Sequence, residues 1–290
     1  MAQNIELPSG QLPVAADGLP RRARGPPMFV TCKVLGKAGR LGNQLFQIAA
    51  TIGTARRNGM EFVFPPWPYA ECFQRPIPQS LQIAATELYV DPDFAYKEIR
   101  LCRSTDLAGC YQSERYFKHC EEEVRGYFTP RPELAGCLRA RFGELLAAKT
   151  CSVHVRRGDY VGDGRFADLA ATDYYERAMG HFSGDTTFLF FSDDIAWCRT
   201  RFRDQRFVFI EGLPEVADLF LMSLCQGHII ANSSFSWWGA WLDPRKDKTV
   251  IAPACWFAGS FNDPDVPFSA IPFQGYLDTR DMLPPEWVRI

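Results

Sequence analysis

Short apolar runs alternate with amphipathic stretches throughout the second half of the chain. Runs rich in β-branched and aromatic residues are typical of buried strands, and apolar positions that recur every three or four residues are typical of helices. Because each run is followed by a helical pattern, the strands are expected to pair in parallel through helical crossovers. The expected strands are 151–155, 187–191, 206–210, 228–231 and 249–252, and the expected helices are 173–181, 194–202, 214–226 and 234–242.

The first half shows the same pattern less regularly. Its proline-rich stretch 65–93 has little periodicity and predicts irregular structure, with aromatic residues that line a surface or pack internally. The expected regular elements are a strand at 29–35, a helix that follows the loop 39–44, a strand at 60–64 and a helix at 132–147.

These elements predict an α/β chain of two halves that meet at a cleft. We expect an N-terminal α/β domain at 28–147 and a C-terminal α/β domain at 148–290. Residues 1–27 are rich in proline, glycine and small polar types, and predict a flexible tail without a core of its own. In parallel sheets, ligands bind beyond the carboxyl ends of the strands, so the cleft is where chemistry is expected.

Composition narrows the function classes. The chain has 32 Lys and Arg against 34 Asp and Glu, a net charge of −2, which argues against a nucleic-acid binder. The ten cysteines include no CxxC pair, so we interpret them as reduced core thiols and not as zinc ligands. The stretch 219–242 is uncharged, but its polar residues and glycine argue against a membrane-spanning helix. The first 29 residues lack the apolar run of a signal peptide, and we expect a cytoplasmic protein.

The most informative segment is 151–164, where a strand delivers His154 and then Arg156, Arg157 and Asp159 to the sheet edge. Adjacent arginines do not suit an apolar core, because each guanidinium stays charged and needs a partner. One interpretation is that an arginine captures a phosphate while the other pairs with Asp159. The alternative is an ion-pair network that fixes the domain junction, and the residues alone do not separate the two.

A second segment, 229–241, runs from a strand through Ser233 and Ser234 into a short aromatic helix. The serines suit the N-cap, and the amino end of a helix suits a diphosphate. Plain helix capping is the alternative, and it is compatible with binding. The tryptophans of this helix are interpreted as core residues in preference to a stacking platform.

Two further features face the same cleft in this scheme. The loop formed by Gly39, Arg40, Gly42 and Asn43 allows close backbone approach, and Asn43 is a candidate helix cap; the loop is not GxGxxG and gives no support to a dinucleotide. Asp218 is expected in the first turn of a helix that Pro214 opens. An acid there stabilises the helix dipole, and it can also accept hydrogen bonds from a purine.

No catalytic metal is predicted. Asp193 and Asp194 follow a strand and could bind a metal, but an N-cap role suffices to explain them. The two DPD tripeptides, at 91–93 and 263–265, are interpreted as turns. Three histidines are interpreted as surface or satisfied core residues: His119, His181 and His228.

Taken together, GRLGNQLFQIA, HVRRGDYV, FLFFSDDIAWC and NSSFSWWGAWL resemble the family 11 glycosyltransferases, the α1,2-fucosyltransferases that use GDP-fucose. The HxRRxD pattern is shared with α1,6-fucosyltransferases, and the other segments narrow the choice. The resemblance implies a GT-B-like fold of two Rossmann-like domains, with the donor on the C-terminal domain and the acceptor on the N-terminal side. It further implies inverting transfer to the 2-hydroxyl of a galactoside, with no metal or other cofactor.

The resemblance also implies roles for individual residues. Arg156 matches the β-phosphate ligand and Arg157 supports it, whereas Asp159 is a candidate base whose alternative role is to orient the arginines. The expected donor-binding residues are His154 and Asp218 at guanine, Ser233 or Ser234 at phosphate, and the loop residues Gly39, Arg40, Gly42 and Asn43. The proline-rich segment after Phe64 is a hypothesis for acceptor selection.

Two alternatives remain open from the sequence. The first is a fucosyltransferase of α1,6 or α1,3 linkage, and the second is a non-catalytic GDP-sugar or glycan-binding protein. The expected partners are GDP-fucose and a galactose-containing glycan, with contact at the membrane periphery if that glycan is lipid-linked.

Overall fold

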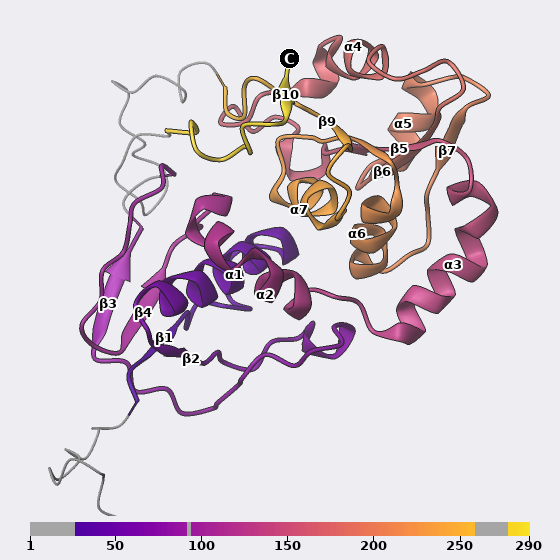
Figure 1. Cartoon of the computed structure of the whole chain (residues 1–290). Helices are drawn as coiled ribbons and strands as arrows, with labels where there is room; N and C mark the ends of the chain where they lie inside the picture. The colour runs from indigo at the N-terminus through magenta and orange to yellow at the C-terminus, as the bar shows by residue number, and fades with distance from the viewer. Residues whose placement is uncertain (1–26, 92–93, 259–277) are drawn as a thin grey trace, which may run out of the picture.

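The computed structural model describes residues 27–91, 94–258 and 278–290. The tail expected at 1–27 therefore lies, apart from Pro27, outside the described residues. The chain forms two α/β halves, each built on a parallel sheet (Figure 1). The first sheet has the order β2-β1-β4-β3, with β1 Phe29–Thr31, β2 Glu61–Phe62, β3 Glu87–Val90 and β4 Thr105–Ala108.

The second sheet has the order β10-β9-β8-β5-β6-β7, and its described strand pairs are all parallel. These findings confirm the α/β class. The strands are β5 Thr150–Val155, β6 Thr187–Ser192, β7 Phe207–Phe209, β8 Gly227–Ile229, β9 Thr249–Ala252 and β10 Val288–Arg289. The helices of this half are α4 Tyr174–Met179, α5 Ile195–Arg201, α6 Glu215–Leu224 and α7 Ser234–Leu242.

The first half carries α1 Leu41–Arg57 and α2 Glu121–Tyr127, and α3 Pro132–Leu146 leads into β5. The strand expected at 29–35 stops at Thr31, because the backbone then folds into turns in which Leu35 N–H donates to the Cys32 carbonyl (3.1 Å). The cap of α1 is Arg40, without a side-chain hydrogen bond, so the expectation that Asn43 caps this helix is wrong. Pro214 takes the cap position of α6, one residue before the expected one.

A shared core holds the two halves together. Phe46 of α1 lies 4.5 Å from Trp237 and 4.9 Å from Trp238 of α7, measured between ring centroids. Phe117 stacks on Trp238 at 5.5 Å. Both tryptophans are almost wholly buried, which confirms them as core residues. Helices α1 and α7 therefore face each other between the sheets (Figure 1), and the domain boundary near residue 148 stays a prediction.

Cys32, Cys151, Cys198 and Cys225 are buried, but the core-thiol interpretation is wrong for three exposed cysteines, Cys102, Cys137 and Cys255. The stretch 219–242 is divided among α6, β8 and α7. In the described part of the chain, none of the helices has the length and apolar character needed to cross a bilayer.

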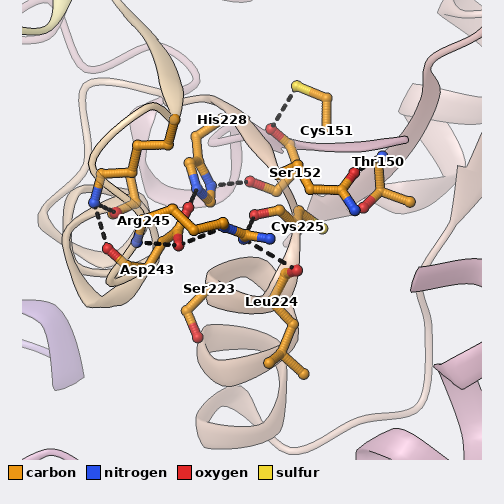
Figure 2. Close-up of polar contacts among 12 residues, drawn as sticks. Thr150, Cys151, Ser152, Ser223, Leu224, Cys225, His228, Asp243 and Arg245 are labelled. Atoms are coloured by element: carbon orange, nitrogen blue, oxygen red, sulfur yellow. Dashed lines mark hydrogen bonds and ion pairs between the residues drawn. The ribbon is translucent and has the colours of Figure 1, made fainter. Parts of the chain in front are cut away.

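A buried polar network stabilises the second sheet. Figure 2 shows the ring of His228 between the Ser152 hydroxyl, 2.9 Å from Nδ1, and the Asp243 carboxylate, 3.0 Å from Nε2. Arg245 Nε donates to the second carboxylate oxygen of Asp243 at 2.8 Å. Ser152, His228 and Asp243 are at most 3% exposed, and a substrate has no access to them. The network therefore satisfies polar groups within the core, and His228 is the satisfied core residue that the sequence predicted.

This network should make the stability of the fold decrease at acidic pH. Burial lowers the pKa of His228 from its ordinary 6.5, and the hydrogen bond with Asp243 only partly opposes this. The unfolded chain therefore binds the extra proton first, and stability falls as the pH drops below about 6.5, by at most about 1.4 kcal/mol per pH unit for one histidine. We expect urea unfolding to give a lower free energy of unfolding at about pH 5.5 than at about pH 7.5.

The matched control is His181→Gln, which changes an exposed histidine and should retain this loss. His228→Gln should lower stability at both pH values and reduce the difference between them. A wild-type free energy of unfolding that is constant over this interval would contradict the argument.

Candidate active site

A cavity of about 570 Å³ lies where the two halves meet. The first half contributes the loop before α1 and the first turn of that helix, together with Phe94, Cys110 and Gln112. The second half contributes the segments that follow β5 and β6 and the amino ends of α6 and α7. The cavity thus lies at the carboxyl edge of the second parallel sheet, the position at which open α/β sheets bind ligands.

The structure brings ten of the eleven expected site residues to this cavity. They are Gly39, Arg40, Gly42, Asn43, His154, Arg156, Asp159, Asp218, Ser233 and Ser234. Arg157 is the exception among them. Its Nε donates to Asp194 Oδ2 at 3.1 Å, and its guanidinium lies 4.0 Å from the centroid of the Trp197 ring. Arg157 therefore anchors α5 to the sheet edge and does not line the cavity.

Arg156 is held between two carboxylates. Its Nη1 lies 2.7 Å from Asp193 Oδ2, and its Nη2 pairs with Asp159 Oδ1. The Arg156 side chain is 11% exposed, whereas that of Asp159 is 61% exposed. The ion-pair network considered from the sequence is present only in part: Arg157 pairs with Asp194 instead, and both partners of Arg156 belong to the second half, so the network lies in the cavity and does not fix the domain junction. An anion that enters can replace the exposed Asp159 as a partner, because Asp193 keeps the guanidinium in place.

Asp193 is a site residue that sequence reasoning missed, because one N-cap explanation covered both neighbouring acids. Only Asp194 caps α5, accepting from Trp197 N–H at 3.1 Å. Asp193 instead accepts from Arg157 N–H at 2.9 Å and pairs with Arg156. The position of Asp193 directly after β6, beside the strand that delivers Arg156, was the available signal.

The amino end of α7 faces the loop of the first half. Ser234 Oγ donates to Asn43 Oδ1 at 2.6 Å, and Gln112 Nε2 donates to the same oxygen at 2.9 Å. Ser233 Oγ caps the helix, accepting from Phe235 N–H at 3.4 Å. The free N–H groups of this nine-residue helix provide positive partial charge at the cavity, which favours an anion.

Two cavity residues hold polar atoms without partners among the described residues. They are His154 Nδ1 and Asp218 Oδ1. Burial lowers the pKa of His154 to about 3, so the ring is neutral near pH 7. Burial, and next the charge of Glu215, raise the pKa of Asp218 to about 7. Unpaired buried polar atoms are costly, and a ligand that supplies hydrogen-bond partners would remove that cost.

The proline-rich segment packs beside the cavity. Trp67 stacks on Phe73 at 5.2 Å, and its Nε1 donates to Gln44 Oε1 at 2.8 Å. Tyr69 donates to Glu215 of α6 and so joins the two halves. None of the described residues 65–91 lines the cavity, so the geometry favours packing over acceptor selection for this segment.

Metal ligands do not gather in the described ranges. Across residues 27–91, 94–258 and 278–290, no three side chains of His, Cys, Asp or Glu form a group that could hold an ion.

Known proteins resemble this chain over most of its length. The model of glycosyl transferase family 11 matches residues 34–269. An alpha-1,2-colitosyltransferase of Escherichia coli is 35% identical over 205 residues, which cover 64% of this chain and 63% of that protein. The chain thus spans less than two thirds of that relative. Galactoside alpha-(1,2)-fucosyltransferase 2 of Oryctolagus cuniculus is 27% identical over 286 residues, 87% of this chain and 75% of that protein.

A solved structure shares the fold. The crystal structure of NodZ alpha-1,6-fucosyltransferase soaked with GDP-fucose aligns with a TM-score of 0.51 at 16% sequence identity, over 76% of this chain and 94% of that one. This likeness confirms the GT-B-like fold expected from the sequence. Because the family model covers most of the sequence, including every residue of the cavity described above, the chain belongs to glycosyl transferase family 11.

Proposed function

We propose that this protein transfers L-fucose from GDP-fucose to the 2-hydroxyl of a galactoside, with inversion and without a metal ion. The observation that carries the proposal is the cavity itself, in which Arg156, the amino end of α7, His154 and Asp218 come together. The names of the fucosyltransferase relatives support the sugar and the linkage.

Each part of the donor has a candidate partner in this cavity. The diphosphate would lie between Arg156 and the free N–H groups of α7, with Ser233 and Ser234 as further donors. The guanine would lie at Asp218, because a carboxylate accepts from two adjacent N–H donors and guanine presents such a pair. Neutral His154 would accept or donate a hydrogen bond beside the guanine. The loop of Gly39, Arg40, Gly42 and Asn43 would close the donor site from the first half.

The mechanism follows from where charge develops. When the bond between C1 of fucose and the phosphate oxygen breaks, negative charge grows on the β-phosphate and the sugar becomes oxocarbenium-like. Arg156 and the helix end stabilise that leaving group in place of a cation. The acceptor hydroxyl attacks from the opposite face and loses its proton to a carboxylate. We assign that role to Asp159, whose carboxylate is exposed and is released towards the acceptor when the phosphate replaces it at Arg156, while Asp193 keeps the guanidinium in place.

A direct assay tests the proposal. Purified protein is incubated with GDP-fucose and lactose, with and without EDTA, and GDP release and the product linkage are measured. GDP-colitose is supplied in parallel, because the 35% identical relative is named for that sugar. Turnover with an α1,2 linkage supports the proposal, and loss of turnover in EDTA contradicts the metal-free step. Another linkage supports a different fucosyltransferase, and GDP binding without turnover supports a binding protein.

Asp218 should make the binding of GDP depend on pH. Its pKa of about 7 means that the free protein holds a mostly protonated carboxyl below that pH, whereas the guanine donors favour the carboxylate. GDP binding should therefore release a proton below pH 7, and affinity should fall about tenfold per pH unit on acidification. Titration calorimetry in two buffers of different ionisation enthalpy measures both effects.

Asp218→Asn is the control that removes the carboxyl and keeps its shape. This variant should bind GDP more weakly, and the remaining pH dependence should be that of the phosphate alone. If wild type and variant show the same pH dependence, Asp218 does not contact the base.

A further inference from the structure

One wall of the cavity is a row of aromatic rings to which neither the sequence nor the donor scheme assigns a role. Tyr160 stacks on Phe166 with ring centroids 3.9 Å apart and planes 10° from parallel. Phe257 lies 5.6 Å from Phe166, and Phe94 lies 5.5 Å from Phe257. All four residues line the cavity, and Phe94 comes from the first half of the chain whereas the other three come from the second.

The row begins at the residue assigned to the phosphate. The Arg156 guanidinium lies 5.3 Å from the Tyr160 ring, and from there the ring contacts continue through Phe166 and Phe257 to Phe94. His154 has its ring contact with Phe235 of α7 at 5.6 Å, and Asp218 lies on α6. The cavity thus has a nucleotide side and an aromatic side, with Arg156 between them.

Three of the four residues are held by hydrogen bonds or a backbone bridge. Tyr160 donates to the Asn232 carbonyl at 3.2 Å, and a backbone bridge joins Phe166 to Phe257, with Ala258 N–H donating to the Arg165 carbonyl at 2.9 Å. Phe94, Tyr160 and Phe166 nevertheless stay only half-buried. Rings that are held rigidly and left open to a cavity offer an apolar face to a ligand at little cost in entropy.

Polar groups stand beside these rings. Arg165 and Asp163 also line the cavity and form a bidentate pair, with distances of 2.9 Å from Nε to Oδ1 and 2.6 Å from Nη2 to Oδ2. A pyranose ring presents C–H groups on its faces and hydroxyls around its edge. An aromatic wall with a charged pair beside it matches both parts, which is the usual composition of a small-ligand pocket.

We infer that the aromatic row is the acceptor subsite, where a sugar ring packs its C–H face against Phe166 and Phe94 and its hydroxyls meet Asp163 and Arg165. This inference rests on the proposed function, because it takes Arg156 as the phosphate ligand. The fucose then lies beside Tyr160, and the acceptor lies beyond it, on the side away from the nucleotide. The subsite needs both halves of the chain, since Phe94 and Phe257 meet across the cavity.

The test separates acceptor binding from donor binding. In Phe166→Ala and Phe94→Ala, the KM for lactose should rise at least about tenfold, because each variant removes buried ring contact with the sugar. The Kd for GDP and the rate of GDP-fucose hydrolysis without acceptor should stay within about twofold, the ordinary range for a site left intact. Phe142→Ala, a half-buried aromatic of α3 outside the cavity, should leave the KM for lactose unchanged.

Two variants from different halves keep the test decisive if one of them does not fold. An unchanged KM for lactose in a folded variant overturns the inference, as does a loss of GDP affinity equal to the loss of lactose affinity. Saturation-transfer NMR of lactose on wild type and Phe94→Ala gives a readout that is independent of turnover. If wild type transfers no sugar, the proposed function fails, but lactose signals that disappear in Phe94→Ala would still support the subsite.

Discussion

Replacing Arg156 with alanine is expected to lower kcat by about two to three orders of magnitude, the loss typical for a group that stabilises developing charge. The guanidinium meets the β-phosphate in the ground state, but the charge it faces grows as the fucose leaves, so kcat should fall more than affinity for GDP. Steady-state kinetics with GDP-fucose and lactose, together with calorimetry of GDP, measure the two effects separately.

The variant also removes the ion-pair partner of Asp193 and leaves it only the hydrogen bond from Arg157 N–H, and a half-buried carboxylate without a counter-charge lowers stability. Arg156→Lys is therefore measured beside Arg156→Ala. Lysine keeps the charge near Asp193 but loses the two-pronged geometry, so we expect it to fold and to retain only part of the turnover. Wild-type kcat in a folded alanine variant would contradict the role of Arg156.

Arg157→Ala is the matched comparison, because it changes the same residue type one position along. The lost contacts are those with Asp194 and Trp197, so we expect a loss of about 1–2 kcal/mol in the free energy of unfolding. Turnover should stay within about tenfold of wild type, since a structural contact near the site acts only indirectly. A loss as large as that of Arg156→Ala in a folded protein would restore the phosphate role that the motif suggested.

The contrast between these arginines also shows what the sequence could have predicted. Consecutive side chains of an extended segment point to opposite sides. Arg156 and Arg157 directly follow β5, so only one of them could face the cavity. The sequence could not say which one, because that depends on the positions of Asp193 and of α5.

The fold was most predictable where burial is continuous. β5 is buried at all six residues, and its apolar run was evident in the sequence. β3 alternates half-buried and exposed residues at an edge of its sheet, and the short β4 carries Asp106. Both were missed, because their pairing with each other and with β1 comes from the tertiary arrangement. β10 has two exposed residues and exists only through its pairing with β9.

The site residues were likewise predictable only where they lie in one continuous motif. Residues in contiguous motifs, such as Ser233 and Ser234, could be assigned to the cleft from strand and helix order alone. The aromatic row could not, because Phe94, Phe166 and Phe257 lie in irregular segments that are distant in sequence. Their meeting depends on loop conformation and on how the two halves pack, and neither leaves a periodic signal.

Gly42→Ala is expected to have the second large effect, by separating the first turn of α1 from α7. A Cβ at Gly42 would lie 2.5 Å from the backbone nitrogen of Phe235 and 2.7 Å from Ser234 Oγ. The backbone of α7 cannot shift away from this Cβ by itself, because Trp237 and Trp238 of α7 are packed against Phe46. We expect overpacking to cost about 1–3 kcal/mol in the free energy of unfolding. GDP affinity should fall at least about tenfold, because the amino end of α7 would be displaced from the phosphate.

Gly136→Ala is the control, since it makes the same substitution within a helix at a position where a Cβ meets nothing within 4 Å. Alanine favours a helix over glycine by about 0.5–1 kcal/mol, so this variant should be as stable as wild type or more so, with unchanged GDP affinity. Both glycines lie in helices, Gly42 in the first turn of α1 and Gly136 inside α3, so a loss seen only in Gly42→Ala comes from the contact between the halves. If Gly42→Ala matches Gly136→Ala in thermal unfolding and in GDP calorimetry, α1 and α7 can separate freely, and the cavity does not depend on their close approach.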